Sequence, residues 1–113
     1  MRIHTALGPG LLESAYRACL CRELQLKDLR YQSEVPLPIT YLGQTTEVGF
    51  RIDLIVEEVV IVEIKAVSQL APVHASQLLS YLRLSGLTVG LLLNFHVRHL
   101  RHGITRMVNT FRD

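Results

Sequence analysis

The sequence predicts an α/β fold in which helices flank a mixed sheet, in the order helix, three strands, helix, strand. Three observations predict it: apolar residues recur at three- and four-residue steps after Gly10, β-branched and aromatic residues dominate between Tyr31 and Val67, and a second helical pattern after Pro72 precedes a nearly continuous apolar run. With 113 residues, 49% hydrophobic and 19% charged, the chain suits one globular domain over residues 1–113.

The first helix follows the turn-forming segment Gly8-Pro9-Gly10 and is expected to run to about Leu26. Its apolar residues fall on one stripe, as in an amphipathic helix that packs on a sheet. Cys19 and Cys21 point to different sides of such a helix, so we interpret both as buried free thiols. The stripe consists of Leu11, Leu12, Ala15, Tyr16, Cys19, Leu20 and Leu24.

Three strands are predicted next. The first contains Pro36 and Pro38, which restrict it to a sheet edge or to an irregular strand. The third has the strongest β-forming composition. The strands are Tyr31 to Ile39, Glu47 to Val56 and Val59 to Val67, joined by a turn at Tyr41 to Gln44 and by the acidic connection Glu57-Glu58.

A second helix is expected from about Val73 to Leu84, because Pro72 suits the first turn of a helix and Ser85-Gly86 suits its end. Leu87 to Phe95 is apolar at nearly every position, which is typical of a strand buried on both faces. A last strand or helix near Ile104 to Phe111 is compatible with the pattern.

The charge and the apolar runs limit the functional classes. The chain has 12 basic and 10 acidic residues, and the resulting net charge of +2 neither requires nor excludes a nucleic-acid partner. The longest apolar runs, Val59 to Val62 and Val89 to Leu93, are far shorter than the ~20 residues of a membrane helix. Met1 to Thr5 lacks the apolar core of a signal peptide, so the expected compartment is the cytosol.

Glu63 and Lys65 are expected to project from one face of the third strand, because side chains alternate along a strand. They would lie roughly 6–7 Å apart along it. Charges in so apolar a strand are costly unless they are paired or bind an ion. An ordinary salt bridge on a solvent-facing surface is the alternative for the triplet Glu63-Ile64-Lys65.

Asp53 strengthens the functional interpretation. Alternation places it on the face opposite to Ile52, and a hairpin around Glu57-Glu58 would bring it beside Glu63. Two close carboxylates repel unless a proton or a cation intervenes. Oxygen ligands suit Mg²⁺ or Mn²⁺, and no Cys/His set supports zinc. Lys65 could then orient an attacking water or stabilise charge on a phosphoryl group.

Gly10, Glu13 and Tyr16 fit the signature GxxExxY, and the chain resembles the family of that name, a compact branch of the PD-(D/E)xK nuclease superfamily. The resemblance implies an αβββαβ restriction-endonuclease-like core, the same order as derived above from the residues. Ile52 departs from the proline of the superfamily's name, and the N-terminal helix is expected to be shortened. The matching segments are Gln32 to Pro38, Tyr41, Gly43, Arg51 to Asp53, Val62 to Ala66, Pro72 to His74, Gln77 to Leu82, Gly90 to Phe95 and Gly103 to Arg106.

The resemblance also implies roles for single residues. Asp53 and Glu63 would be metal ligands, Lys65 the catalytic lysine, and Glu13 a carboxylate that completes the acidic cluster. The Ile64 carbonyl would supply a further oxygen ligand. For Glu13 the alternative is a favourable charge near a helix N-terminus.

Gln77 and Tyr81 would match the Q-x-x-x-Y element of the exonuclease-like branch of the superfamily. Their spacing puts both on one face of the second helix, from which they could reach the same site. The alternative for this pair is an ordinary helix surface, and for Tyr16 of the signature it is core packing.

The last part of the chain carries a basic cluster, which could contact phosphates. A solvated polar tail is the favoured interpretation, and a metal site built from its three histidines is the least favoured. The cluster consists of His96, Arg98, His99, Arg101, His102 and Arg106.

Together these features predict a magnesium-dependent nuclease that hydrolyses nucleic-acid phosphodiester bonds, with DNA favoured over RNA. The alternatives are a catalytically inactive module that binds nucleic acid or a protein partner, and a homo-oligomer in which a second copy covers exposed strand edges.

Overall fold

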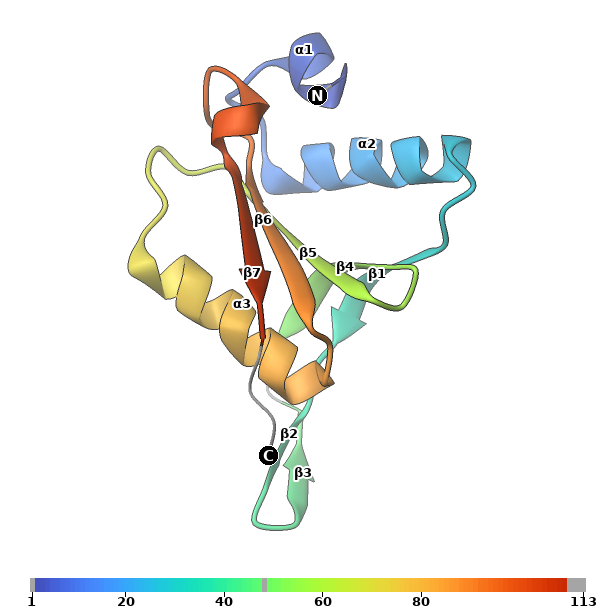
Figure 1. The fold of residues 1–113 in the computed structure, drawn as a ribbon, viewed down its shortest axis with the longest axis vertical. Helices are drawn as coiled ribbons and strands as arrows, with labels where there is room; N and C mark the ends of the chain where they lie inside the picture. Colours follow the sequence, from blue (N-terminus) through green and yellow to red (C-terminus); the bar gives the residue numbers. More distant parts are fainter. Residues whose placement is uncertain (1, 48, 110–113) are drawn as a thin grey trace.

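The computed structural model describes residues 2–47 and 49–109 (Figure 1). It contains helices on both sides of a central sheet, which confirms the predicted α/β class. The elements are α1 (Arg2–Leu7), α2 (Glu13–Leu26), β1 (Tyr31–Pro36), β2 (Ile39–Tyr41), β3 (Gln44–Thr46), β4 (Arg51–Val56), β5 (Val60–Lys65), α3 (Pro72–Ser85), β6 (Val89–Asn94), the 3₁₀ turn η1 (Leu100–His102) and β7 (Ile104–Val108).

The main sheet has the strand order β1-β4-β5-β6-β7 and is mixed. Only β5 and β6 run parallel, and α3 connects them across one face, as parallel neighbours require. The other pairs are antiparallel. This arrangement is consistent with the restriction-endonuclease-like core that the sequence predicts.

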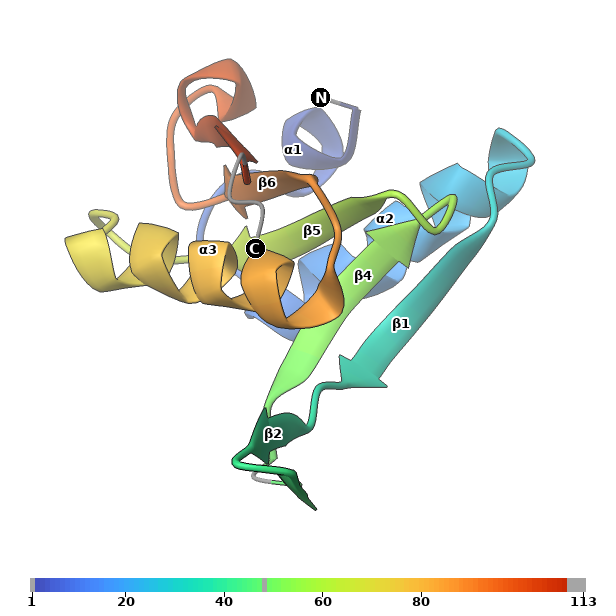
Figure 2. The ribbon, with the colours of Figure 1, turned by 60° about the horizontal axis from the view of Figure 1, so that its bottom comes forward.

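The two long helices cover opposite faces of the sheet (Figure 2). Alternation along β5 divides its side chains between two cores: Val62 and Ile64 pack on the α2 side, and Ile61 packs on the α3 side. Leu92 of β6 joins the α3 side, and Leu91 the α2 side, so the apolar run of β6 faces both layers as predicted.

The Tyr16 side chain holds the turn that precedes α2. Its side chain is fully buried and its ring stacks on Phe95, with centroids 4.3 Å apart. Its hydroxyl donates to the Gly8 carbonyl at 2.5 Å and accepts from the Leu11 N–H at 3.1 Å. The turn requires positive φ angles at Gly8 and Gly10, which glycine adopts without steric cost. These contacts support the core-packing interpretation of Tyr16.

The residue pattern gave no helix before Gly8, where the family resemblance implied a shortened N-terminal helix and the structure has α1. The pattern also placed the start of α2 close to Gly10 instead of at Glu13. The short helix α1 is held by tertiary contacts and not by its own length. Ile3 is buried, and the ring of His4 lies 2.6 Å from the Val97 carbonyl oxygen.

The edge strand β1 is distorted at Glu34, as its prolines predicted. Glu34 has a φ of 53°, a left-handed conformation that costs a residue with a side chain about 1–2 kcal/mol. The paired residues on either side are Ser33 with Leu54 and Val35 with Ile52. Ile52 packs in the α3-side core whereas Leu54 packs in the α2-side core, so the expected strict alternation of β4 fails between these two residues.

Strand β4 begins at Arg51, so the predicted strand from Glu47 to Val56 is too long at its start. Earlier in the chain, β2 and β3 form a separate two-stranded sheet, which projects from the body of the molecule (Figure 1). At its tip Tyr41 and Leu42 are largely exposed.

The last segment contains β7, paired antiparallel with β6, so its strand alternative is confirmed over Ile104–Val108. The basic residues from His96 to Arg106 are exposed, as a solvated surface requires. Residues 110 and 111 of the predicted element lie outside the described part. Within that part, no helix is long and apolar enough to cross a membrane.

Tyr16→Phe should destabilise the protein by about 1–2 kcal/mol, because the Gly8 carbonyl and the Leu11 N–H lose their partner while the ring stays packed. Tyr31→Phe, which removes an exposed hydroxyl bonded to Gln25, should cost less than about 0.5 kcal/mol. Urea unfolding of the two variants measures this difference, and equal losses would contradict the role of Tyr16.

Candidate metal centre

The β4–β5 hairpin sets the geometry of the site. Its connection spans residues 57–59, with positive φ at both Glu57 (52°) and Glu58 (60°), and the Val59 N–H donates to the Val56 carbonyl at 3.1 Å. The register pairs Leu54 with Val62, and one rung beyond this last pair Asp53 stands opposite Glu63. The predicted hairpin is therefore confirmed.

At this pair of residues, hydrogen bonds from backbone N–H groups to the two carboxylates replace the hydrogen bonds between the two backbones. Glu63 Oε1 accepts the Asp53 N–H at 3.1 Å, and Asp53 Oδ2 accepts the Ile64 N–H at 2.8 Å. Each strand thus contributes one backbone donor and one side-chain acceptor. The two acidic groups are held side by side where β4 and β5 separate.

The pair is electrostatically unfavourable without a proton or a cation. Glu63 is only 4% exposed. Burial, followed by the charge of Asp53, raises the pKa of Glu63 to about 8, although the Asp53 N–H and the charge of Lys65 act in the opposite direction. A neighbouring cation would favour the ionised form of both carboxylates.

Lys65 ends β5 and is half-buried. The next turn is clamped by Asn94, whose side chain accepts the Val67 N–H at 3.1 Å and donates to the Val67 carbonyl at 3.0 Å. The Phe95 N–H also donates to the Lys65 carbonyl at 2.8 Å. Asn94 therefore fixes the backbone beside Lys65. Its one sequence indication was a single amide at the end of an apolar run.

Gln77 and Tyr81 line a common groove of about 600 Å³, which confirms that they share one face of α3. The groove is mostly apolar and also contains Phe50, whose ring centroid is 6.1 Å from that of Tyr81. Burial and the charges of Glu63 and Asp53 raise the pKa of the Tyr81 hydroxyl, so Tyr81 lies within electrostatic range of the acidic pair. No hydrogen bond within the described residues links Gln77 to either carboxylate.

Glu13 begins α2 and is half-buried. Across residues 2–47 and 49–109, no three His, Cys, Asp or Glu side chains are arranged to hold a metal ion, so Glu13 does not complete a preformed cluster with Asp53 and Glu63. The histidines of the basic segment do not form one either; the rings of His99 and His102 pack edge to face.

Arg17, one turn after Glu13, is the residue that α2 places at the acidic pair. Its Nη1 lies 3.5 Å from Asp53 Oδ1, and its Nη2 lies 3.2 Å from Glu34 Oε1. The sequence pattern had assigned Arg17 no role in the site. Its four-residue spacing from Glu13 was the available indication, because such residues share a helix face.

The donor set fits a hard divalent cation. Both side chains offer oxygen, and Mg²⁺ is commonly bound by one or two carboxylates with water completing its shell. The guanidinium of Arg17 pairs with Asp53, so a positive charge is already bound beside this carboxylate.

The comparisons with known proteins agree with this chemistry. Residues 1–107 match the family model described as the PD-(D/E)XK nuclease superfamily. No curated protein and no solved structure gives a significant match to the chain.

The metal-free protein should lose stability as the pH rises from about 4.5 to about 8. Glu63 keeps its proton up to about pH 8 when folded, whereas in the unfolded chain it releases the proton near its ordinary value of 4.5, so the unfolded state binds fewer protons in this window. The slope due to this group is at most about 1.4 kcal/mol per pH unit. Urea unfolding in EDTA should show this decline in the wild type and lose it in Glu63→Gln. Parallel stability curves for the two proteins would contradict the raised pKa.

Proposed function

Because the chain belongs to the PD-(D/E)XK nuclease superfamily, we propose that it is a metal-dependent nuclease that hydrolyses phosphodiester bonds in nucleic acid, with Asp53 and Glu63 as its metal ligands. The observation that carries this proposal is the exchange of carboxylate hydrogen bonds between the two strands. It holds two acidic groups together, one of them buried, and Arg17 pairs with the other.

Mg²⁺ or Mn²⁺ is the proposed cofactor, and in such a site it polarises the phosphoryl group and lowers the pKa of a bound water. The Ile64 carbonyl is proposed as a further ligand. The Ile64 N–H points toward Asp53, and the N–H and C=O of one strand residue point to the same edge, so this carbonyl also faces the site. Glu13 is proposed as an outer carboxylate that approaches from the start of α2.

Lys65 is proposed as the catalytic lysine, whose ammonium orients the attacking water or stabilises charge on the phosphoryl group. It is on the same strand face as Glu63, and the Asn94 clamp limits its backbone motion. Tyr81 and Gln77 are proposed to position the substrate from the adjoining groove.

We also propose that the chain belongs to the GxxExxY branch and acts on DNA in preference to RNA, in the cytoplasm. The branch assignment is supported by Gly10, Glu13 and Tyr16 in their signature positions. The exposed basic residues Arg98 and Arg101 supply phosphate contacts without base specificity.

A second candidate is a nuclease-fold module that binds nucleic acid or a protein partner without turnover. It is favoured by the lack, among residues 2–47 and 49–109, of a preformed cluster of three metal ligands. A homo-oligomer is compatible with either candidate, since no further strand of the described part of the chain pairs with either edge of the β2–β3 sheet.

Cleavage of labelled single- and double-stranded DNA and RNA in Mg²⁺ or Mn²⁺ tests the proposal. Asp53→Asn, Glu63→Gln and Lys65→Ala should each lower the rate by about 100-fold or more, as expected when a group that stabilises the transition state is removed. The exposed changes Lys27→Ala and Glu58→Gln are matched controls and should leave it unchanged. Unaltered cleavage by the Glu63 and Lys65 variants would exclude this active site, and tight binding without cleavage by the wild type would favour the second candidate.

A further inference from the structure

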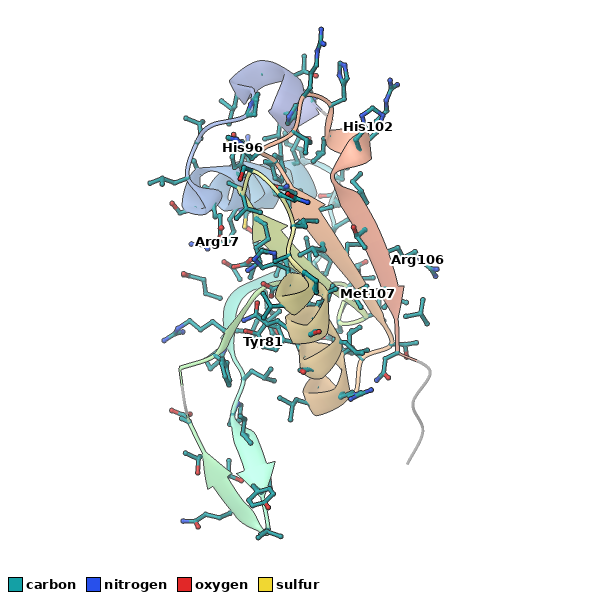
Figure 3. The ribbon with its side chains drawn as sticks, turned by 90° about the vertical axis from the view of Figure 1, so that its left-hand side faces the viewer. Arg17, Tyr81, His96, His102, Arg106 and Met107 are labelled. Carbon is teal, nitrogen blue, oxygen red and sulfur yellow. The ribbon has the colours of Figure 1, made fainter. Side chains whose placement is uncertain are left out.

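Arg17 bridges two carboxylates that come from different strands. Asp53 in β4 and Glu34 in β1 both contact its guanidinium, at 3.5 and 3.2 Å. The Arg17 side chain is 22% exposed and that of Asp53 is 20%, whereas that of Glu34 is 56% exposed. In Figure 3, Arg17 extends from α2 on the side of the molecule that also shows Tyr81 of α3. The bridge therefore lies at the open margin of the acidic pair.

The Asp53 oxygens have separate partners. Oδ2 is occupied by the Ile64 N–H, which is part of the sheet, so this oxygen is fixed in place. Oδ1 is the oxygen that faces Arg17. A divalent cation that binds Asp53 through Oδ1 would meet the positive guanidinium, and like charges at this separation repel.

Glu34 is held in an unusual conformation at this point. Its left-handed φ of 53° interrupts the edge strand opposite Asp53, between two regular pairs. Strained residues of this kind concentrate at functional sites, where the surrounding structure enforces them. Here the strained residue supplies the outer carboxylate for Arg17, which keeps one anchor if Asp53 is released.

From these contacts we propose that Arg17 exchanges partners during substrate binding. Without nucleic acid it pairs with Asp53 and opposes metal binding; with nucleic acid its guanidinium turns to a backbone phosphate, and Asp53 becomes available to the cation. Arginine suits this exchange because its planar donors can bind both carboxylate and phosphate in a bidentate manner. The inference rests on the proposed function, and it makes the binding of metal and nucleic acid mutually favourable.

A purely structural ion pair is the competing explanation, and the two differ in the sign of one measurement. If Arg17 only supports the fold, its removal leaves the affinity for a divalent cation unchanged or lowers it. If Arg17 competes with the cation, its removal raises that affinity. Metal affinity can be measured without turnover, so this comparison does not depend on catalytic activity.

The test is a titration with Mn²⁺, followed by electron paramagnetic resonance of the free ion, in the absence of nucleic acid. Arg17→Gln should bind Mn²⁺ about 10-fold more tightly than the wild type, within the usual range of such couplings. Arg22→Gln is the matched control, since Arg22 lies on the same helix and, within residues 2–47 and 49–109, its side chain contacts neither carboxylate of the pair but bonds to Gln25 at 3.4 Å. It removes the same charge and should leave the affinity unchanged. Arg17→Met, which keeps the aliphatic stem, is the second variant if the glutamine variant does not fold.

A second titration measures the coupling in the Lys65→Ala background, which suppresses cleavage. A ten-nucleotide oligothymidylate should tighten Mn²⁺ binding about 10-fold when Arg17 is present and should have no such effect in Arg17→Gln. An otherwise identical oligonucleotide with neutral methylphosphonate linkages should produce no coupling, because it offers the guanidinium no charged phosphate.

The outcomes separate this inference from the proposed function. Weaker or unchanged Mn²⁺ binding by the Arg17 variants, with loss of binding in Asp53→Asn, would overturn the exchange and leave the metal site intact. Mn²⁺ binding that persists in both Asp53→Asn and Glu63→Gln would overturn the metal site itself. Equal tightening by Arg22→Gln would reduce the effect to net charge and would also overturn the exchange.

Discussion

The structure depends on the hydrogen bonds that Asp53 and Glu63 exchange across the end of the β4–β5 hairpin. The Asp53 N–H binds one carboxylate and the Ile64 N–H binds the other, so the ladder continues through side chains after the backbones have separated. The hairpin turn sets this register, and a shift of one residue would turn both carboxylates to other partners. The site is thus a consequence of strand pairing, without a dedicated loop.

The same arrangement opposes stability in the absence of a cation. Burying Glu63 beside Asp53 keeps the pKa of Glu63 high, and a purely structural role would be served equally well by two neutral side chains. Residues from neighbouring elements nonetheless support the site. The backbone after β5 is clamped by Asn94, Tyr81 approaches from α3, and Arg17 approaches from α2. A buried carboxylate with a raised pKa, held in place by its neighbours, is typical of sites that bind a charged ligand.

Much of the architecture could be predicted from the sequence, because it follows from local periodicity. The two long helices, the hairpin and the parallel strand after α3 each have a clear pattern, and strand alternation alone placed Glu63 with Lys65. The sequence pattern did not show the β2–β3 sheet, because its short polar strands resemble a turn. The residue pattern did not show the helix α1, which only the family resemblance implied, because α1 depends on contacts with residues some ninety positions away, such as the bond between His4 and Val97.

The parts of the site that sequence reasoning missed are those created by packing. Arg17 contacts Asp53 because α2 crosses the sheet near β4, and the shared helix face of Arg17 and Glu13 indicates a direction but not that crossing. The left-handed Glu34 and the Asn94 clamp likewise depend on neighbours distant in sequence. Conversely, Glu13 entered the site through the family resemblance, and the described residues do not gather it into a metal cluster.

The Asp53 and Glu63 carboxylates, which join β4 and β5 through hydrogen bonds, are proposed to form a metal centre. Crystals of the wild-type protein soaked in Mn²⁺ at pH 8.5, above the pKa of about 8 for Glu63, test it most directly through the anomalous signal of the ion. An anomalous peak is expected within about 2.0–2.3 Å of one oxygen from Asp53 and one from Glu63. A fully occupied Mn²⁺ elsewhere, with the two carboxylates unbound, would contradict it.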